Sequence, residues 1–471
     1  MTIWQPDLTH RIGPRYRAIA DALMTDVREG RLRPGDRLPT HRDLAWRLGV
    51  TVGTVSRAYD EAQRRGLIAG EVGRGTFIQP LTPLVPVDPG PTRPASDPMP
   101  DQTPPAGGLI NFSNNYPVPG AEARLLAGTL RDIAAEADLG ELLRYQPHGG
   151  RSAGREAGAL WLRRAGIDAD PERLVITGGG QHALATVLAA TTNPGDTAAT
   201  EALTYPGVRA ACHQRHVRLE GIAMDEIGIL PDAFAAVCRA TPPRVLYLTP
   251  NLHNPTAGVL PLDRRKAIVE IARAHDVTIV EDDVYGFLID APPAFVTLAP
   301  ERSIYVTSLS KSTAPGLRIG YVLAPRDRYD RLAAAIRSTI WMAAPLMVEI
   351  ATRWLQDGTI AQLAAAKRQE ATRRQSLARQ VLGNRYTSQP SAYHLWLPMP
   401  EAWRAEDFAT EARRRGVGVT ASSAFAVMRH GIPQAVRLCL GAPADIATVE
   451  RGLRVIADLL REQPDSCLSV V

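Results

Sequence analysis

Residues 308–321 read SLSKSTAPGLRIGY, and this stretch contains Lys311, one of only three lysines in a chain of 471 residues. Almost all of the 54 basic side chains are arginines instead. An arginine guanidinium stays protonated in proteins, so it cannot replace a lysine whose neutral amine has to react. A lysine in this serine-rich and apolar stretch therefore indicates a need for a primary amine. The alternative is an ordinary surface lysine in a loop.

Short apolar runs alternate with helical patterns on both sides of this stretch. Alternation of this kind predicts βαβ units, in which helices join parallel strands. The predicted fold class is therefore α/β, with a mainly parallel sheet. A long helix and a smaller α+β portion are expected from about residue 330 to 465. The predicted strands cover residues 174–176, 244–248, 277–280, 304–306 and 319–323.

Two polar motifs directly follow predicted strands. TGGGQ at residues 177–181 opens an apolar helix, and glycines at a helix N-terminus let backbone N–H groups approach a phosphate. EDDVY at residues 281–285 places carboxylates at the end of a strand, where negative charge favours the protonated form of a nearby nitrogen. A plain turn is the alternative interpretation of the first motif, and solvent-facing acidic residues or a helix cap are the alternatives for the second.

Taken in this order, the motifs resemble those of the fold type I aminotransferases over roughly residues 109–465. The resemblance implies that pyridoxal 5′-phosphate (PLP) forms an internal aldimine with Lys311. It also implies a homodimer whose sites combine residues of both subunits. Further matching stretches are RYQPHGG at 144–150, TYPG at 204–207, PNLHNPT at 250–256 and VRLCL at 436–440.

The resemblance gives each matching residue a role. Asp282 would keep the pyridine nitrogen protonated, and Tyr285 with Asn254 would contact the phenolic oxygen. Arg437 would hold a carboxylate with its two forked donors. A structural ion pair for Arg437 and a core position for Tyr205 are the alternatives. The other cofactor-binding residues would be Gly180, Gln181, Ser308, Ser310 and Arg318, with Tyr205 stacked on the ring and Tyr145 reaching the phosphate of the neighbouring subunit.

Residues 11–79 predict a second, smaller domain. Helical periodicity covers residues 15–29, a second helix follows at 40–48, and a third runs over about 51–65. A hairpin then has the glycine-rich tip 73–75. Helix, turn, helix and glycine-tipped hairpin are the parts of a winged helix-turn-helix.

Positive charge is concentrated in the same region. Residues 1–79 contain thirteen arginines and nine acidic residues, a net charge of +4, whereas the whole chain carries +5. Basic charge gathered in one small region indicates a polyanionic partner. An ordinary solvated surface is the alternative.

A proline-rich linker is predicted between the two domains. Residues 80–108 contain ten prolines in 29 positions. Proline fixes φ and lacks a backbone donor, so this composition disfavours helices and central strands. Extended as polyproline II, the linker would span about 90 Å.

The front domain resembles the GntR type of winged helix in PGDRLPTHRDLA at 34–45 and LGV at 48–50. Such a head on an aminotransferase-like body is the arrangement of MocR-type transcriptional regulators, which implies a double-stranded DNA operator as partner. Val52 and Gly53 stand where many relatives have an arginine, so the operator sequence stays open. The residues implied near bases or phosphates are Arg42, Thr51, Thr54 and Arg57, with Arg74 at the minor groove.

These features predict a transcriptional regulator that senses an amine or amino acid by forming an external aldimine, which releases Lys311. An active aminotransferase with an appended DNA-binding head is the main alternative, and a head that only mediates dimerisation is another. The sequence has no signal-peptide pattern and no apolar stretch long enough for a membrane span, so a cytoplasmic location without a membrane partner is expected.

Overall fold

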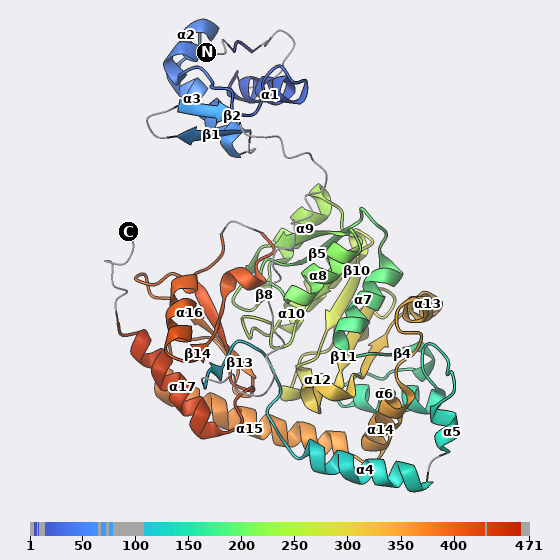
Figure 1. Cartoon of the computed structure of the whole chain (residues 1–471). Helices are drawn as coiled ribbons and strands as arrows, with labels where there is room; N and C mark the ends of the chain where they lie inside the picture. The colour runs from blue at the N-terminus through green and yellow to red at the C-terminus, as the bar shows by residue number, and fades with distance from the viewer. Residues whose placement is uncertain are drawn as a thin grey trace. The chain divides into compact units, whose positions relative to one another are not determined.

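The computed structural model describes residues 4–6, 8, 15–64, 67–71, 75–78, 108–136, 138–428 and 431–462. The chain divides into two compact units, Met1–Asp101 and Gln102–Val471 (Figure 1). Arg74 at the predicted wing tip and all of the predicted linker except Gly108 lie outside the described residues, so both stay predictions.

The first unit consists of three helices and a two-stranded antiparallel sheet. The hydroxyl of Thr40 accepts the backbone N–H of Asp43 at 3.2 Å and so caps the second helix. Gly49 ends that helix with a φ of 61°. The winged helix-turn-helix fold is confirmed in the described residues. Its elements are α1 (Arg15–Arg28), α2 (His41–Leu48), α3 (Val52–Arg64), β1 (Ile68–Glu71) and β2 (Gly75–Ile78).

A seven-stranded sheet with the order β4-β12-β11-β10-β9-β5-β6 organises the second unit. All neighbouring strands pair in parallel except β12, which is antiparallel to both β11 and β4. The mainly parallel sheet is therefore confirmed. Its strands are β4 (Leu174–Thr177), β5 (Thr197–Glu201), β6 (Arg218–Ile222), β9 (Val245–Leu248), β10 (Thr278–Asp282), β11 (Ser303–Ser308) and β12 (Gly320–Leu323).

Side chains alternate between the two faces of this sheet, and both faces are covered. Val245 and Tyr247 pack with α7, α8 and α13, whereas Leu246 and Leu248 pack with α9, α10 and α11. Full burial of one such aliphatic side chain contributes about 1.5–3 kcal/mol. The covering helices are α7 (Gly180–Thr191), α8 (Pro206–Gln214), α9 (Pro231–Ala240), α10 (Leu262–Ala274), α11 (Phe295–Leu298) and α13 (Tyr329–Thr339).

A smaller α+β portion follows, as expected, but the helical region before it is divided. Pro345 begins one helix, and Gly358, with a φ of 83°, precedes the next, so three helices stand where one long helix was predicted. They are α13, α14 (Pro345–Gln356) and α15 (Thr359–Leu382). The small portion adds α16 (Ala405–Arg414), α17 (Ile446–Leu459) and a sheet of β13 (His394–Pro398), β16 (Ala435–Cys439) and β15 (Thr420–Ala421).

The first strand of the second unit belongs to this small portion. β3 (Ile110–Asn111) pairs in parallel with β14 (Val417–Gly418), far away in the sequence. No helix among the described residues is long and apolar enough to cross a membrane. The remaining α-helices and strands are α4 (Glu122–Glu136), α5 (Leu139–Leu142), α6 (Ser152–Arg163), α12 (Leu309–Ser312), β7 (Met224–Asp225) and β8 (Gly228–Ile229).

Candidate cofactor site and DNA-binding head

The large sheet brings the predicted site residues to one edge. Carboxyl ends of parallel strands lie at the same edge, where ligands bind in open α/β folds. Thr177 ends β4, Asp282 ends β10 and Ser308 ends β11. Asn254 lies in the loop that follows β9. The spacing of the motifs along the sequence thus becomes proximity in space.

Lys311 lies in α12, directly after β11. Its Nζ donates to the backbone oxygen of Asn115 and lies 5.9 Å from the centroid of the Tyr285 ring. Burial lowers the pKa of Lys311 to about 8. The amine is therefore more readily deprotonated than that of an ordinary surface lysine.

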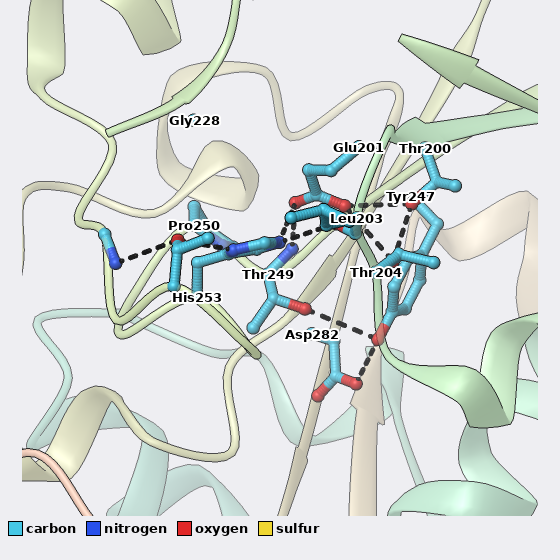
Figure 2. Close-up of polar contacts among 12 residues, drawn as sticks. Thr200, Glu201, Leu203, Thr204, Gly228, Tyr247, Thr249, Pro250, His253 and Asp282 are labelled. Atoms are coloured by element: carbon cyan, nitrogen blue, oxygen red, sulfur yellow. Dashed lines mark hydrogen bonds and ion pairs between the residues drawn. The ribbon is translucent and has the colours of Figure 1, made fainter. Parts of the chain in front are cut away.

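Asp282 has two differently placed carboxylate oxygens. Oδ2 accepts the Tyr247 hydroxyl at 2.7 Å, whereas Oδ1 is buried without a hydrogen-bond partner among the described residues. Figure 2 shows Oδ1 pointing away from Tyr247. Burial raises the pKa of Asp282 to about 7. A buried acceptor without a donor indicates a missing N–H or O–H group.

A cradle of backbone and side-chain donors lies at the N-terminus of α7. Arg318 donates to the Gly178 oxygen at 3.0 Å, and a Cβ added to Gly179 would lie only 2.6 Å from an Arg318 nitrogen. Gly179 has a φ of 93°, which favours glycine. A Cβ added to Gly180 would lie 3.5 Å from the Ser308 Oγ, which accepts the Ser310 N–H at 3.4 Å. The geometry therefore suits an anion at a helix N-terminus.

Gln181 and Tyr205 meet at Gly207. The Gln181 amide donates to the Gly207 oxygen at 3.0 Å. A Cβ added to Gly207 would lie 2.2 Å from the Tyr205 ring. Tyr205 directly precedes α8 and is half-buried. The Tyr205 ring thus packs directly against Gly207, where any larger residue would clash with it.

Tyr285 is paired with a residue that the sequence interpretation missed. Its hydroxyl accepts the Asn115 side-chain amide at 2.9 Å, although 170 residues separate the two. Asn115 therefore contacts Tyr285 with its side chain and Lys311 with its backbone. No local pattern around Asn115 distinguishes it from an ordinary turn asparagine.

Arg437 lies in the centre of β16 and is buried. One guanidinium nitrogen donates to Asn254 Oδ1 at 2.7 Å, and another donates to the backbone oxygen of Ser113. The guanidinium carbon also lies 4.6 Å from the centroid of the Phe425 ring. No carboxylate of the described residues forms an ion pair with Arg437, so the structural ion pair that the sequence left open is not found there.

The loop that carries Asn254 is fixed by a buried arginine. Arg265 donates to Asn251 Oδ1 at 2.6 Å and to the Leu260 oxygen at 2.9 Å. It also forms a fully buried ion pair with Glu281 at 3.4 Å. A buried guanidinium needs several hydrogen-bond acceptors, and the acceptors of Arg265 connect the loop to Glu281 of β10.

A second set of buried polar residues lies near Asp282, and the sequence interpretation also missed it (Figure 2). Tyr247 in β9 bridges toward Thr249, whose backbone N–H donates to Glu201 at 2.8 Å. His253 lies beside Glu201, with 3.8 Å between Nε2 and Oε1. Glu201 and His253 are both almost fully buried.

Tyr145 does not join these residues. Its side chain is 83% exposed and its ring lies 5.7 Å from that of the half-exposed Trp341. The predicted contact of Tyr145 with a neighbouring subunit stays a prediction.

Apart from Arg74, which lies outside the described residues, the predicted DNA-binding residues lie on α2 and α3 or at their ends. Arg42 and Arg57 are exposed. The Thr51 hydroxyl accepts the Thr54 N–H at 3.2 Å and contacts the Thr54 hydroxyl at 2.9 Å, so it caps α3. Thr51 thus has a structural role besides the predicted one.

Comparison with known proteins identifies both units. The family "Aminotransferase class I and II" matches residues 108–456, and "Bacterial regulatory proteins, gntR family" matches residues 15–78. The uncharacterized HTH-type transcriptional regulator YdeF of Bacillus subtilis is 28% identical over 97% of this chain and 96% of its own length. The HTH-type transcriptional regulator YjiR of Escherichia coli is 31% identical over 68% of this chain and 70% of its own.

Among solved structures, that of α-aminoadipate aminotransferase LysN of Thermus thermophilus is similar to the structure of this chain. That structure holds N-(5′-phosphopyridoxyl)-L-leucine. It is 26% identical with a TM-score of 0.68, over 75% of this chain and 92% of its own.

Proposed function

The chain belongs to the aminotransferase class I and II family and carries a gntR-family head, as MocR-type transcriptional regulators do, and on this premise we propose that it is a DNA-binding regulator which uses PLP to sense an amino acid or amine at Lys311. The observation that carries this proposal is the combination in one chain of a lysine-centred site and a helix-turn-helix head with exposed arginines.

The residues present fit PLP. A protonated pyridine N–H would satisfy the buried Asp282 Oδ1. The α7 N-terminus with Ser308 and Arg318 offers donors for the phosphate. When bound, PLP supplies an aldehyde that condenses reversibly with primary amines and a ring that withdraws electrons.

The chain's own groups prepare the site for an amine. With a pKa of about 8, roughly a tenth of Lys311 is neutral at pH 7, far more than for an ordinary lysine. The neutral amine is the form that reacts with a carbonyl carbon. Release of Lys311 by an incoming amine would be the sensing event.

Arg437 favours an effector that carries a carboxylate. Its guanidinium now donates to Asn254 and to the Ser113 carbonyl. A carboxylate is a stronger acceptor for the arginine fork than these neutral oxygens. We therefore propose an amino acid rather than a simple amine as effector, in a homodimeric cytoplasmic protein whose Tyr145 completes the partner subunit's site.

An active aminotransferase with an appended head is the second candidate. The convergence of Lys311, Asp282, Tyr285 and Arg437 favours it, because turnover requires the same groups. A basic DNA-binding head has no use in such an enzyme, which is why the regulator is preferred.

A spectral titration of the PLP-loaded protein with a panel of amino acids and amines tests the proposal. We expect one or a few amino acids to shift the visible absorbance band without release of keto acid. Many turnovers with a keto-acid acceptor would establish the enzyme instead.

Substitution of Lys311 tests where the cofactor is held. Lys311→Ala should abolish the visible band, whereas Lys266→Ala, at an exposed lysine, should keep it. A band that survives in Lys311→Ala would disprove the assignment.

A further inference from the structure

Glu201 is a buried carboxyl group at the end of β5 to which the proposed function assigns no role. Its exposed fraction is 2%. Oε1 accepts the Thr249 backbone N–H at 2.8 Å, and Oε2 accepts the hydroxyls of Thr200 at 2.8 Å and Thr204 at 3.4 Å (Figure 2). Every one of these partners is neutral. The Thr200 hydroxyl can donate to an ionised carboxylate, and it can equally accept the proton of a carboxylic acid, because a hydroxyl does both.

His253 does not supply a positive charge to Glu201. Its Nε2 contacts the Leu203 carbonyl at 3.0 Å, and a carbonyl only accepts, so Nε2 carries the hydrogen. Nδ1 pairs with the Thr256 hydroxyl at 2.8 Å, which leaves the imidazole satisfied with one proton. Burial also lowers the pKa of His253 to about 4. His253 is the only ion-pair partner of Glu201 within 4.0 Å among the described residues.

A short bridge links Glu201 to Asp282. The two acids end β5 and β10, the strands on either side of β9. Tyr247 of β9 donates its single proton to Asp282, so its oxygen is free to accept from the Thr249 hydroxyl at 3.5 Å. Thr249 in turn donates its backbone N–H to Glu201. The Tyr247 hydroxyl thus donates to Asp282, and the Thr249 backbone N–H donates to Glu201.

It is energetically unfavourable for two carboxyl groups linked in this way to be ionised at the same time. Burial raises the pKa of Glu201 to about 7, and a negative charge on Glu201 also raises the pKa of Asp282. Asp282 also faces Lys311 and Asp283. Lys311 favours the ionised form of Asp282 in the cofactor-free site, and a pyridine N–H at Asp282 Oδ1 would favour it in the loaded site. Glu201 has no such cation among the described residues, so we assign the first negative charge to Asp282.

We propose that Glu201 is a positioning residue of the cofactor site, a carboxylic acid that stays protonated while Asp282 is ionised and that holds Thr249 and Tyr247 in place against Asp282. The proposal rests on the proposed function above, since Asp282 is taken as the partner of the PLP ring nitrogen. Ionisation of Glu201 at higher pH places a second negative charge behind Asp282. The pyridine nitrogen of a bound PLP would then hold its proton more strongly.

The isosteric variant Glu201→Gln separates charge from shape. A glutamine replaces the protonated acid, so the PLP-loaded variant should retain cofactor within about twofold of the wild type. Its visible absorbance, followed from acidic to alkaline pH, should lack one titration step that the wild type shows. Its infrared spectrum should lack the C=O stretch of one protonated carboxyl group. The control Glu226→Gln, at an exposed glutamate, should change neither property.

Two further variants complete the test. Glu201→Ala leaves the Thr249 N–H without an acceptor and should weaken PLP binding about tenfold. Tyr247→Phe removes the bridge, and its effect on the pH profile should be non-additive with that of Glu201→Gln.

The failures are distinguishable. A wild type without a PLP absorbance band refutes the proposed function. A wild type with the band refutes only the role of Glu201 if Glu201→Gln keeps every titration step and the carboxyl stretch, or if it loses PLP as Glu201→Ala does. Additive effects of Tyr247→Phe and Glu201→Gln refute the coupling.

Discussion

Asp282 is a single residue that shows how a buried carboxyl oxygen requires a hydrogen-bond donor. Its Oδ1 has no donor among the described residues, and burial raises its pKa from 3.8 to about 7. In the cofactor-free protein the folded state therefore holds a proton that the unfolded chain releases near pH 4. The group destabilises the folded state progressively as the pH rises through this window.

The first prediction concerns this pH dependence. Because the folded state binds more protons, the free energy of unfolding of the cofactor-free protein should fall between about pH 4 and pH 7, with a slope of up to about 1.4 kcal/mol per pH unit from one group. Asp282→Asn should reduce that slope in urea denaturation at a series of pH values. Asp168→Asn, at an exposed aspartate, is the control. Equal slopes for both variants would contradict the prediction.

Residues that follow strands in recognisable motifs could be predicted from the sequence. The structure brings Lys311, Asp282 and Tyr285 together as their motifs suggest. Asn115 and Tyr247 could not be predicted. They join the site through contacts across 170 and 35 residues, and no local spacing encodes such contacts.

At the scale of elements, composition determined which strands were recognised. Apolar runs revealed the five predicted strands, whereas β5, with the sequence TAATE, and β6, with RLEGI, lack such runs. Their register depends on pairing with β9 and with each other. The antiparallel direction of β12 was equally hidden, because an apolar run has no direction.

The turn before α7 gives the second prediction. Gly179→Ala adds a Cβ within 2.6 Å of an Arg318 nitrogen at a φ of 93°. It should lower the affinity of the cofactor-free protein for PLP by at least about tenfold, measured by absorbance titration. The reason is that the new Cβ would push the Arg318 guanidinium away from the α7 N-terminus, where both offer donors to the phosphate. Gly195→Ala has a nearly equal φ of 89° but nothing within 4 Å of the new Cβ. It should cost stability and leave PLP affinity unchanged; equal affinity in both variants would show that the cradle does not bind the phosphate.

At the scale of the whole molecule, composition alone indicated two units. The concentration of arginine before the proline-rich region and the alternating pattern after it correspond to the two compact units of the structure.

The third prediction tests the head in the full-length protein. Arg57→Ala removes an exposed cation from α3 and should weaken binding to the protein's own promoter region. If Arg57 contacts one phosphate, the slope of log K against log salt should become shallower by about 0.9. Arg163→Ala, at an exposed arginine of α6, should leave the slope unchanged. An unchanged slope in Arg57→Ala would exclude that phosphate contact.

The segment after β3 suggests a test of coupling between effector binding and DNA binding. The chain enters the body at β3, and within a few residues the Ser113 carbonyl meets Arg437 and the Asn115 carbonyl meets Lys311. If the effector is an amino acid, as proposed, its carboxylate would displace the Ser113 carbonyl from Arg437. In the sequence, Ser113 comes shortly after the residues that join the two units.

Such a connection is necessarily reciprocal. Whatever factor the amino acid imposes on DNA affinity, DNA imposes on amino-acid affinity, typically about 5- to 150-fold. Spectral titrations with and without promoter DNA should therefore differ by the same factor as DNA-binding curves with and without the amino acid. A factor of one in both experiments would show that the segment does not couple them; any other value makes the promoter itself an effector of the small-molecule site.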